Sequence, residues 1–498
     1  MTHSTLPSLV LTSAAEALPA ELAPLLRQHL QLLAHCVEAF RRQPPTPPTT
    51  CQFENDLAQC LRALGRDLVE WAFNHLETDD AHALPTQVSW QHEAYQRRPK
   101  SPKRHCDCLF GPLRLYRYRF DPVDGGEQSL FPLEMALGLE AQRATPALAE
   151  RVGRAAAVLP QAGVREQLAR DHAVRWSVPT LRKVTASLSA GLAEHREAAQ
   201  AAKLVEALRQ AATSAGPHEP TLVTGRDGVM VPLRGQEHHG EASAATVSVL
   251  DRQGRRLYTA YLGRMPEKLQ ATLSRQLTSL LVLVLSLWRG QLPRLLYVTD
   301  GGWHPTSYFC QVLRRLKHPL TGARLCWERV IDFFHACEYL SQLAEALYGR
   351  SQKRRFAWAA KMRRWLRYRT SGIQRLLYSA GAVHARRQLS ASAEEDYQEA
   401  RQYLHKRKRW MKYAAYKRQG LAIGSGVTEA ACKTVFTQRL KQSGMRWYVE
   451  GGQVVVDLRI VLLSRVWQET HGAYLESKPQ VEIGTLWTSS AGSARKAA

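Results

Sequence analysis

Asp300 stands where a folded chain could present a carboxylate for chemistry. It ends an apolar run, Leu295 to Val298, and is followed by Gly301 and Gly302. The pattern predicts a buried strand that delivers an acid to its exposed end, where a glycine loop can admit a metal ion or a phosphate. It also fits an aspartate that caps a strand-to-helix turn. A second acid beside Asp300 would favour chemistry over capping.

Asp227 is the acid that the surrounding elements would place there. It lies within an apolar extended segment, and turn residues follow that segment. Three strands, a helix, a strand, a helix and a strand are predicted over residues 222–232, 245–250, 256–262, 266–288, 295–300, 305–317 and 324–332. This is the order of a ribonuclease-H-like α/β fold, in which the first and fourth strands are neighbours. Asp227 and Asp300 would then face each other across the sheet.

Facing carboxylates repel each other unless a cation lies between them. Two Mg²⁺ ions held by acids, for which Mn²⁺ can substitute, can activate a water or hydroxyl on one side of a phosphodiester and stabilise the leaving oxygen on the other. Such chemistry usually needs a third acid. Glu429 is a candidate, because Gly424, Ser425 and Gly426 predict a capped helix start that carries it in the first turn.

The charge of the chain indicates a polyanionic partner. Its 498 residues are enough for about three domains and carry a formal net charge of +24. Residues 341–420 hold 20 Lys and Arg against 5 Asp and Glu, whereas residues 1–100 hold 8 against 11. Aromatic residues interleave the basic ones, as on nucleic-acid-binding surfaces, although aromatic residues at helical spacing also form cores. The predicted DNA contacts in this stretch are Lys353, Arg354, Arg355, Arg363 and Arg364.

The N-terminal part is predicted to be helical, then extended, then helical again. Residues 1–96 form a helical assembly domain broken by prolines, and residues 97–144 form a basic β-rich segment. Within residues 145–215, a short helix, a turn and a serine-capped second helix match a helix-turn-helix. Arg182 and Lys183 would lie on its recognition helix, although many helical hairpins share this pattern.

The cysteines and the apolar runs bear on the compartment. Nine scattered cysteines and the lack of a basic-then-apolar N-terminal pattern favour a reducing cytoplasm. Cys106 and Cys108 are too closely spaced for a usual zinc site, and no second pair lies near them. The longest apolar run, residues 280–288, is too short to span a bilayer, so no membrane partner is expected.

Four motifs carry a resemblance to a known family. They are GRDG at Asp227, VTDGG at Asp300, DFFHACEYL at Asp332 and GSGVTEAACKTVFTQRLKQSGMRW at Glu429. In this order they resemble the DDE transposases of bacterial insertion sequences, specifically the Kra-type group related to Mutator-like elements. The resemblance covers about residues 220–470, and its last motif is the most specific. The Cys-x-x-Cys pair that such relatives often carry is missing at residues 120–126, so no structural zinc is implied.

The resemblance implies that Asp227, Asp300 and Glu429 are the catalytic, metal-binding acids. Asp227 would bridge two Mg²⁺ ions, and each of the others would complete one. Water would cleave at the transposon end, and the liberated 3′-hydroxyl would attack target DNA. His335 would orient the scissile phosphate, and Asp332 would fix the tautomer of His335. The alternative is that His335 is a buried structural histidine. The implied DNA contacts after the third acid are Lys433, Arg439, Lys441, Arg446 and Trp447, of which the last two would grip the end near the cut.

The implied catalytic domain spans residues 216–335 and 421–475, with a basic helical insertion at 336–420 and a flexible tail at 476–498. Its partners would be double-stranded DNA at the transposon ends and at the target. The protein would act as a homo-oligomer, at least a dimer, on the nucleoid of a bacterial cytoplasm. Two other classes fit the same residues. One is a ribonuclease-H-like nuclease or resolvase that cleaves without joining, and the other is a non-catalytic DNA-binding protein descended from a transposase.

Overall fold

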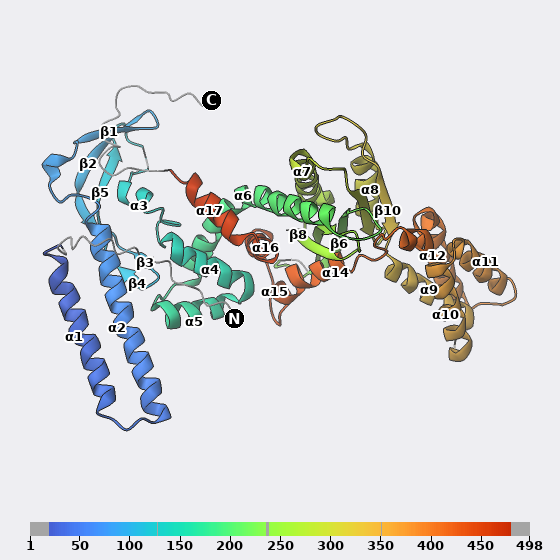
Figure 1. Cartoon of the computed structure of the whole chain (residues 1–498), viewed down its shortest axis with the longest axis horizontal. Coiled ribbons are helices and arrows are strands. Elements are labelled where there is room, and N and C mark those ends of the chain that lie inside the picture. Colours follow the sequence, from blue (N-terminus) through green and yellow to red (C-terminus); the bar gives the residue numbers. More distant parts are fainter. Residues whose placement is uncertain (1–18, 127, 236–238, 350, 480–498) are drawn as a thin grey trace. The chain divides into compact units, whose positions relative to one another are not determined.

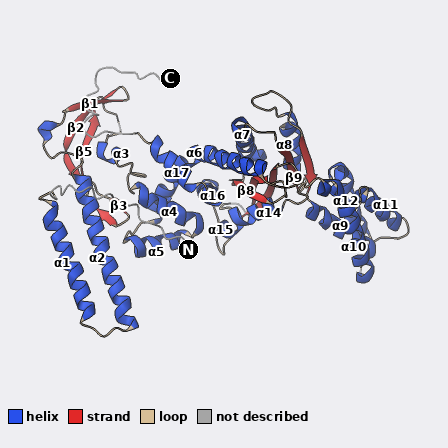
Figure 2. Cartoon of the chain, in the orientation of Figure 1, coloured by secondary structure: helices blue, strands red, loops and turns tan. Residues whose placement is uncertain are grey.

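A five-stranded mixed sheet lies at the centre of the C-terminal half of the chain (Figures 1 and 2). The computed structural model describes residues 19–126, 128–235, 239–349 and 351–479. The sheet has the strand order β10-β9-β6-β7-β8. Its strands are β6 (Thr221–Val231), β7 (Gly240–Leu250), β8 (Arg256–Arg264), β9 (Arg294–Thr299) and β10 (Trp327–Ile331).

The strand pairing follows from the lengths of the connections. Turns join β6, β7 and β8 into an antiparallel meander, and helices α7 (Ala271–Leu287) and α8 (Trp303–Gln311) return the chain so that β9 and β10 run parallel to β6. The predicted order of elements is confirmed, and so is the pairing of the first strand with the fourth. The second strand begins at Gly240 rather than at Ala245, because its first residues pair with the end of β6.

Side-chain alternation gives the sheet two buried faces. One face packs against α7, α8 and the C-terminal half of α6 (Val178–Thr213). It carries residues such as Leu222, Val247 and Tyr297. The helix predicted from Pro266 starts later because Leu269 and Gln270 have positive φ angles, which interrupt the helix.

The opposite face is covered by two groups of helices. Over β6 to β8 lie α14 (Gly426–Ala431), a π-helical turn (Cys432–Thr437) and α16 (Val449–Leu463). Against β9 and β10 packs the core of the helical insertion. Its helices are α9 (Phe333–Tyr348), α10 (Gln352–Tyr368), α11 (Gly372–His384), α12 (Ala391–Arg407) and α13 (Tyr413–Arg418).

Two units divide the described chain. One holds the residues up to Arg151, Gly163–Val184 and those from Lys478, and the other holds Val152–Ala162 and Thr185–Ser477. The predicted segment 145–215 is therefore shared between both units. Helix α17 (Trp467–Ser477) extends past the predicted start of the tail at residue 476. Residues 480–498 of that tail lie outside the described residues.

The first unit combines a helical hairpin with small sheets. The hairpin consists of α1 (Leu22–Arg41) and α2 (Pro47–Asn74). The strands are β1 (Gln87–Trp90), β2 (Glu93–Pro102), β3 (Cys106–Cys108), β4 (Gly111–Leu113) and β5 (Tyr116–Pro122). The prediction of a helical domain up to residue 96 was wrong, because the second helix ends at Asn74 and strands follow it. The start of the predicted basic β-rich segment belongs to β2, which pairs with β5 through a bulge between Arg98 and Ser101.

The predicted helix-turn-helix segment folds as two helices and a turn. Helix α5 (Gln161–His172) is followed by a turn with Ala173 at a φ of 54° and then by α6. The Ser177 hydroxyl accepts from the Thr180 amide at 3.3 Å, as expected of a capping serine. Arg182 and Lys183 are exposed, and their contact with DNA stays a prediction. None of the described helices has the length and apolarity needed to cross a membrane.

Candidate active site

Asp227 and Asp300 lie side by side on one face of the sheet. The register of the parallel strands pairs Arg226 with Thr299, so the next residue of each strand is an acid. Strand alternation turns both carboxylates away from the face that carries Arg226 and toward the face that carries α14. Both acids are half-buried. The arrangement that the sequence predicts for these two acids is therefore present.

Glu429 is brought to the same face by a close contact between α14 and β6. A Cβ atom at Gly225 would lie 2.0 Å from the Thr428 hydroxyl oxygen, so only glycine lets the helix approach this strand. The Thr428 hydroxyl also hydrogen-bonds to the Thr246 hydroxyl of β7 at 2.7 Å. These contacts hold the first turn of α14 on the sheet, and Glu429 follows Thr428 directly.

The three acids influence one another electrostatically. Burial raises the pKa of Asp227 above its ordinary value, and the negative charges of Asp300 and Glu429 raise that pKa further. Hydrogen bonds from the Gly228 amide at 2.8 Å and the Cys432 thiol at 3.5 Å partly offset the rise. Burial and the same acids also raise the pKa of Cys432, so this thiol stays protonated as a donor. The site concentrates negative charge that a cation would relieve.

The donor set suits a hard divalent cation. Three carboxylates offer oxygen ligands of the kind that Mg²⁺ and Mn²⁺ prefer. Within the described ranges, no three His, Cys, Asp or Glu side chains already surround a common metal position. Glu429 instead contacts the ammonium group of Lys433 at 3.1 Å, which neutralises part of its charge. Asp227, Asp300 and Glu429 fit a metal site by their chemistry and by their shared face.

Asp332 has a different role from the predicted one. It is 4% exposed and is the N-cap of α9, where it accepts hydrogen bonds from the amides of Phe334 at 2.6 Å and His335 at 3.0 Å. Its other oxygen accepts from the amide and the hydroxyl of Ser425. The prediction that Ser425 caps its own helix was wrong for the same reason. Asp332 therefore ties the start of the insertion to the loop before Glu429 and has no oxygen left for DNA.

His335 is turned away from Asp332. Its Nδ1 atom lies 2.8 Å from a carboxylate oxygen of Glu338, so the prediction that Asp332 fixes its tautomer was wrong. Its ring makes edge contacts with the rings of Tyr339 and Tyr403, and the side chain is 35% exposed. The exposed part leaves His335 free to contact a phosphate, which stays a prediction.

Two residues of the insertion hold the loop that carries Asp300. The Tyr403 hydroxyl donates to the main-chain oxygen of Asp300, and the Arg407 guanidinium donates to the main-chain oxygen of Gly301 at 2.7 and 3.0 Å. Gly301 has a φ of 81°, and a Cβ atom there would lie 2.6 Å from Arg407. Tyr403 stacks on Tyr339 of α9 at 3.7 Å between ring centroids. These contacts were not predicted, and the only sequence signal is the four-residue spacing of Tyr403 and Arg407.

Arg226 of the GRDG motif supports the opposite face of the sheet. It is 2% exposed and donates to Ser274 at 3.0 Å and to the side-chain oxygen of Gln270 at 2.8 Å. Its guanidinium lies over the ring of Tyr308 at 4.7 Å. Arg226 thus fastens α7 and α8 behind the strand that presents Asp227.

The residues predicted to contact DNA divide into exposed and buried sets. Arg439 is 1% exposed, donates to the Ala156 carbonyl and has a pKa that burial lowers to about 10, so the prediction of a DNA contact was wrong. Trp447 is half-buried, and its indole donates to the Leu440 carbonyl at 2.9 Å. Arg355 is half-buried and pairs with Glu345 at 3.2 Å. The predicted DNA contacts of the second unit that are exposed are Lys353, Arg354, Arg363, Arg364, Lys433, Lys441 and Arg446.

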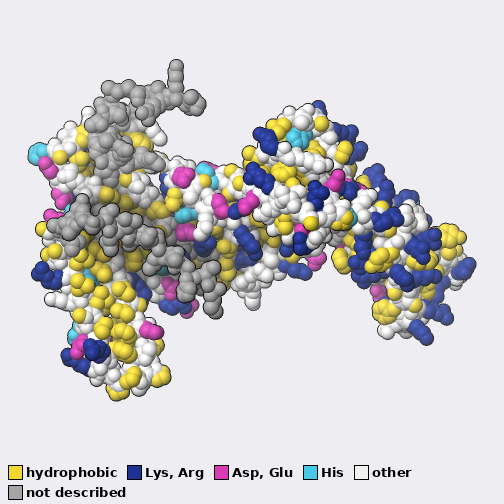
Figure 3. All heavy atoms as spheres, in the orientation of Figure 1, with side chains coloured by type: hydrophobic (Ala, Val, Ile, Leu, Met, Phe, Trp, Pro, Cys, Tyr) yellow, Lys and Arg dark blue, Asp and Glu magenta, His cyan; other side chains and the backbone are white. Residues whose placement is uncertain are grey.

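Cationic side chains gather over the insertion. Figure 3 shows Lys and Arg spread over the helices from α9 to α12. Residues 336–420 hold 20 Lys and Arg against 6 Asp and Glu. The same helices contact the Asp300 loop through Tyr403 and Arg407, so one element joins a strongly cationic surface to the acids.

No protein-family model matches the chain, and no curated protein matches it either.

Proposed function

We propose that the protein is a DDE-type DNA transposase with a ribonuclease-H-like catalytic domain. It would bind the ends of an insertion sequence and catalyse divalent-metal-dependent strand cleavage and strand transfer. The observation that supports the proposal is the placement of Asp227 beside Asp300 on the sheet face against which the helix of Glu429 packs, next to a strongly cationic helical insertion. Carboxylates alone would repel a phosphodiester, so this pairing makes sense for phosphate chemistry that uses cations.

Each residue has a defined task in this mechanism. Divalent ions, when bound, would supply an activated water or hydroxyl and would offset the charge of the phosphate and the leaving oxygen. Asp227, Asp300 and Glu429 would hold those ions. Tyr403 and Arg407 keep the Asp300 loop in place. The cationic insertion binds the DNA backbone, and His335 would contact the phosphate near the cut.

Substitutions that preserve side-chain size test the role of the acids. Asp300→Asn keeps the size of the side chain and removes its charge, so Mg²⁺-dependent cleavage of the flanking DNA should fall to background while end binding is retained. Asp227→Asn and Glu429→Gln should behave alike. The matched controls are Asp396→Asn on α12 and Glu450→Gln on α16, which are exposed and lie outside the site. A variant with Asp300→Asn that still cuts would refute the assignment.

A strand-transfer assay separates the proposal from its rivals. The wild-type protein is incubated with pre-cut ends, target DNA and Mg²⁺, and the products are mapped at nucleotide resolution. A transposase yields the joined product. A nuclease or resolvase would cleave uncut ends without making that product, and a non-catalytic protein would bind both substrates and change neither.

A further inference from the structure

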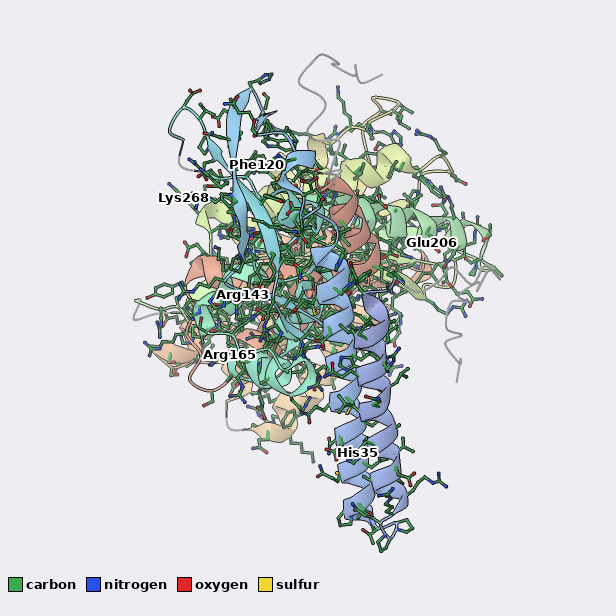
Figure 4. All side chains as sticks on the ribbon, turned by 90° about the vertical axis from the view of Figure 1, so that its left-hand side faces the viewer. His35, Phe120, Arg143, Arg165, Glu206 and Lys268 are labelled. Atoms are coloured by element: carbon green, nitrogen blue, oxygen red, sulfur yellow. The ribbon has the colours of Figure 1, made fainter. Side chains whose placement is uncertain are left out.

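The helical hairpin of α1 and α2 has too little buried surface for a finished element. Helix α1 has 20 residues, of which only His29 is fully buried, and α2 has 28 residues with no fully buried side chain among the described residues. Figures 1 and 4 show the far half of the hairpin, which the His35 label marks in Figure 4, projecting beyond the strands of its own unit. Helices of this length are stabilised chiefly by packing of an apolar face. Among the described residues, the hairpin therefore lacks a packing partner except along the last part of α2, from Gly65, which Phe110 and the core around Cys106 contact.

The sequence of α1 carries more apolar positions than a two-helix contact uses. One seam faces α2 with alternating spacings of four and three residues, and it comprises Leu22, Leu26, His29, Leu33, Cys36 and Phe40. Its contacts include His29 with Asp67 at 2.9 Å and Phe40 with Phe53 at 4.4 Å between rings. Leu30 and Val37 each lie one position after a residue of this seam, His29 and Cys36. Apolar residues at such flanking positions are typical of helices with more than one neighbour.

These flanking side chains form an exposed apolar surface with one residue of α2. Leu30 is 63% exposed, Val37 is 42% exposed and Leu61 is 49% exposed. Heptad positions of an antiparallel pair place all three on the same face of the hairpin. Figure 3 shows hydrophobic side chains along the hairpin in that view. We call Leu30, Val37 and Leu61 the hairpin face.

The charge of the hairpin argues against nucleic acid as its partner. Residues 22–74 contain 5 Lys and Arg and 5 Asp and Glu, in a chain with a net charge of +24. A neutral apolar surface does not attract a polyanion. Another apolar protein surface, in contrast, is stabilised by contact with it.

We propose that the hairpin face binds the hairpin face of a second copy of this chain, giving a four-helix bundle. A two-fold pairing places the same apolar residues against each other and closes the assembly at two copies. It also gives each helix the two neighbours of a bundle. Two helices, each about 10 Å wide and about 30 Å long, offer a face of about 600 Å². This approaches the roughly 800 Å² per partner of a standard protein interface. The inference does not depend on the proposed transposase activity.

The test is the oligomeric state of the full chain without DNA. Wild-type protein and a Leu30→Glu/Val37→Glu variant are compared by light scattering and sedimentation over a range of concentrations. The wild type should be a dimer, and the variant should dissociate with a Kd at least about 100-fold higher, because two carboxylates per copy would be buried in an apolar interface. The matched control is Gln28→Glu/Gln31→Glu, which adds the same charges at exposed positions away from the hairpin face.

Circular dichroism establishes that each variant keeps its helix content, which is expected because the replaced side chains are exposed. A monomeric wild type, or a dimer that persists unchanged in the Leu30→Glu/Val37→Glu variant, overturns the proposal. So does a wild-type monomer that dimerises only after removal of residues 1–18, because the chain itself would then cover the hairpin face. Dissociation of the control variant to the same extent would also overturn it.

Discussion

Two helical regions of this protein present opposite surfaces. The hairpin of α1 and α2 is electrically neutral and exposes aliphatic side chains, whereas the insertion at residues 336–420 holds 20 Lys and Arg against 6 Asp and Glu. Each insertion helix from α9 to α13 buries several of its own side chains, so the insertion has a core of its own. We propose that the hairpin surface binds another protein and that the insertion surface binds a polyanion. Helical structure alone therefore does not indicate the partner.

The insertion differs from the hairpin in a second way, because it reaches the candidate active site within its own unit. Its helix α12 contacts the main chain of Asp300 and Gly301, and its helix α9 begins at Asp332, which holds the loop before Glu429. DNA bound on the insertion would thus act on elements that position two of the three acids. Three experiments test this difference between the two helical regions.

The largest expected effect is on catalysis through Arg407. Arg407→Ala removes both hydrogen bonds to the Gly301 carbonyl and lets the Asp300 loop move, so cleavage should slow about 100-fold, as expected for a displacement of about 1 Å. Single-turnover cleavage and DNA affinity are measured together. The control is Arg401→Ala, which removes an exposed charge from the same helix.

If Arg401→Ala and Arg407→Ala slow cleavage equally, the insertion acts through its charge and not through its contact with the loop. A shift in the Mg²⁺ concentration needed for half-maximal rate, seen only with Arg407→Ala, would identify a positioning role. Tyr403→Phe keeps the stack on Tyr339 and removes one hydrogen bond. This substitution should also slow cleavage, but by less than Arg407→Ala does.

Strand alternation and element order predict much of this site, and long-range contacts do not follow from either. The order of the predicted elements makes β6 and β9 neighbours, and this neighbourhood brings Asp227 beside Asp300. The contact of Tyr403 with Asp300 spans 103 residues and depends on how α9 and α12 pack. No local pattern encodes such a contact.

Two wrong predictions have the same physical cause. Arg439 was assigned to DNA as part of the cationic helix that the resemblance implies after Glu429, yet it lies in the interior and donates to a backbone carbonyl. Asp332 was assigned to His335 because the resemblance implies such a pair, yet the three-residue spacing also suits an N-cap that accepts from its own first-turn amides. A residue type and a spacing define what a side chain can do, and tertiary packing selects among the possibilities.

The second experiment compares charge in the two helical regions. Arg363→Ala/Arg364→Ala on α10 should weaken DNA binding about 10-fold and lower the slope of log affinity against log salt by about 2, since each phosphate contact contributes about 0.9. Arg41→Ala/Arg42→Ala removes the same charge from the end of the hairpin, where both side chains are about three-quarters exposed. That variant should leave the slope unchanged. If both variants lower the salt slope by the same amount, the hairpin also binds DNA.

The smallest expected effect concerns local stability. Because the hairpin has few buried side chains of its own, its backbone amides should exchange with solvent faster than those of α9 and α12 at low protein concentration. Raising the concentration should slow exchange in the hairpin by about three- to ten-fold, because pairing with a second copy stabilises it by mass action. Exchange in the insertion should not depend on concentration. The Leu30→Glu/Val37→Glu variant should lose the dependence in the hairpin. A dependence that appears equally in both regions would place the contact between copies elsewhere, and the difference between neutral and cationic helices would then not predict which region binds protein.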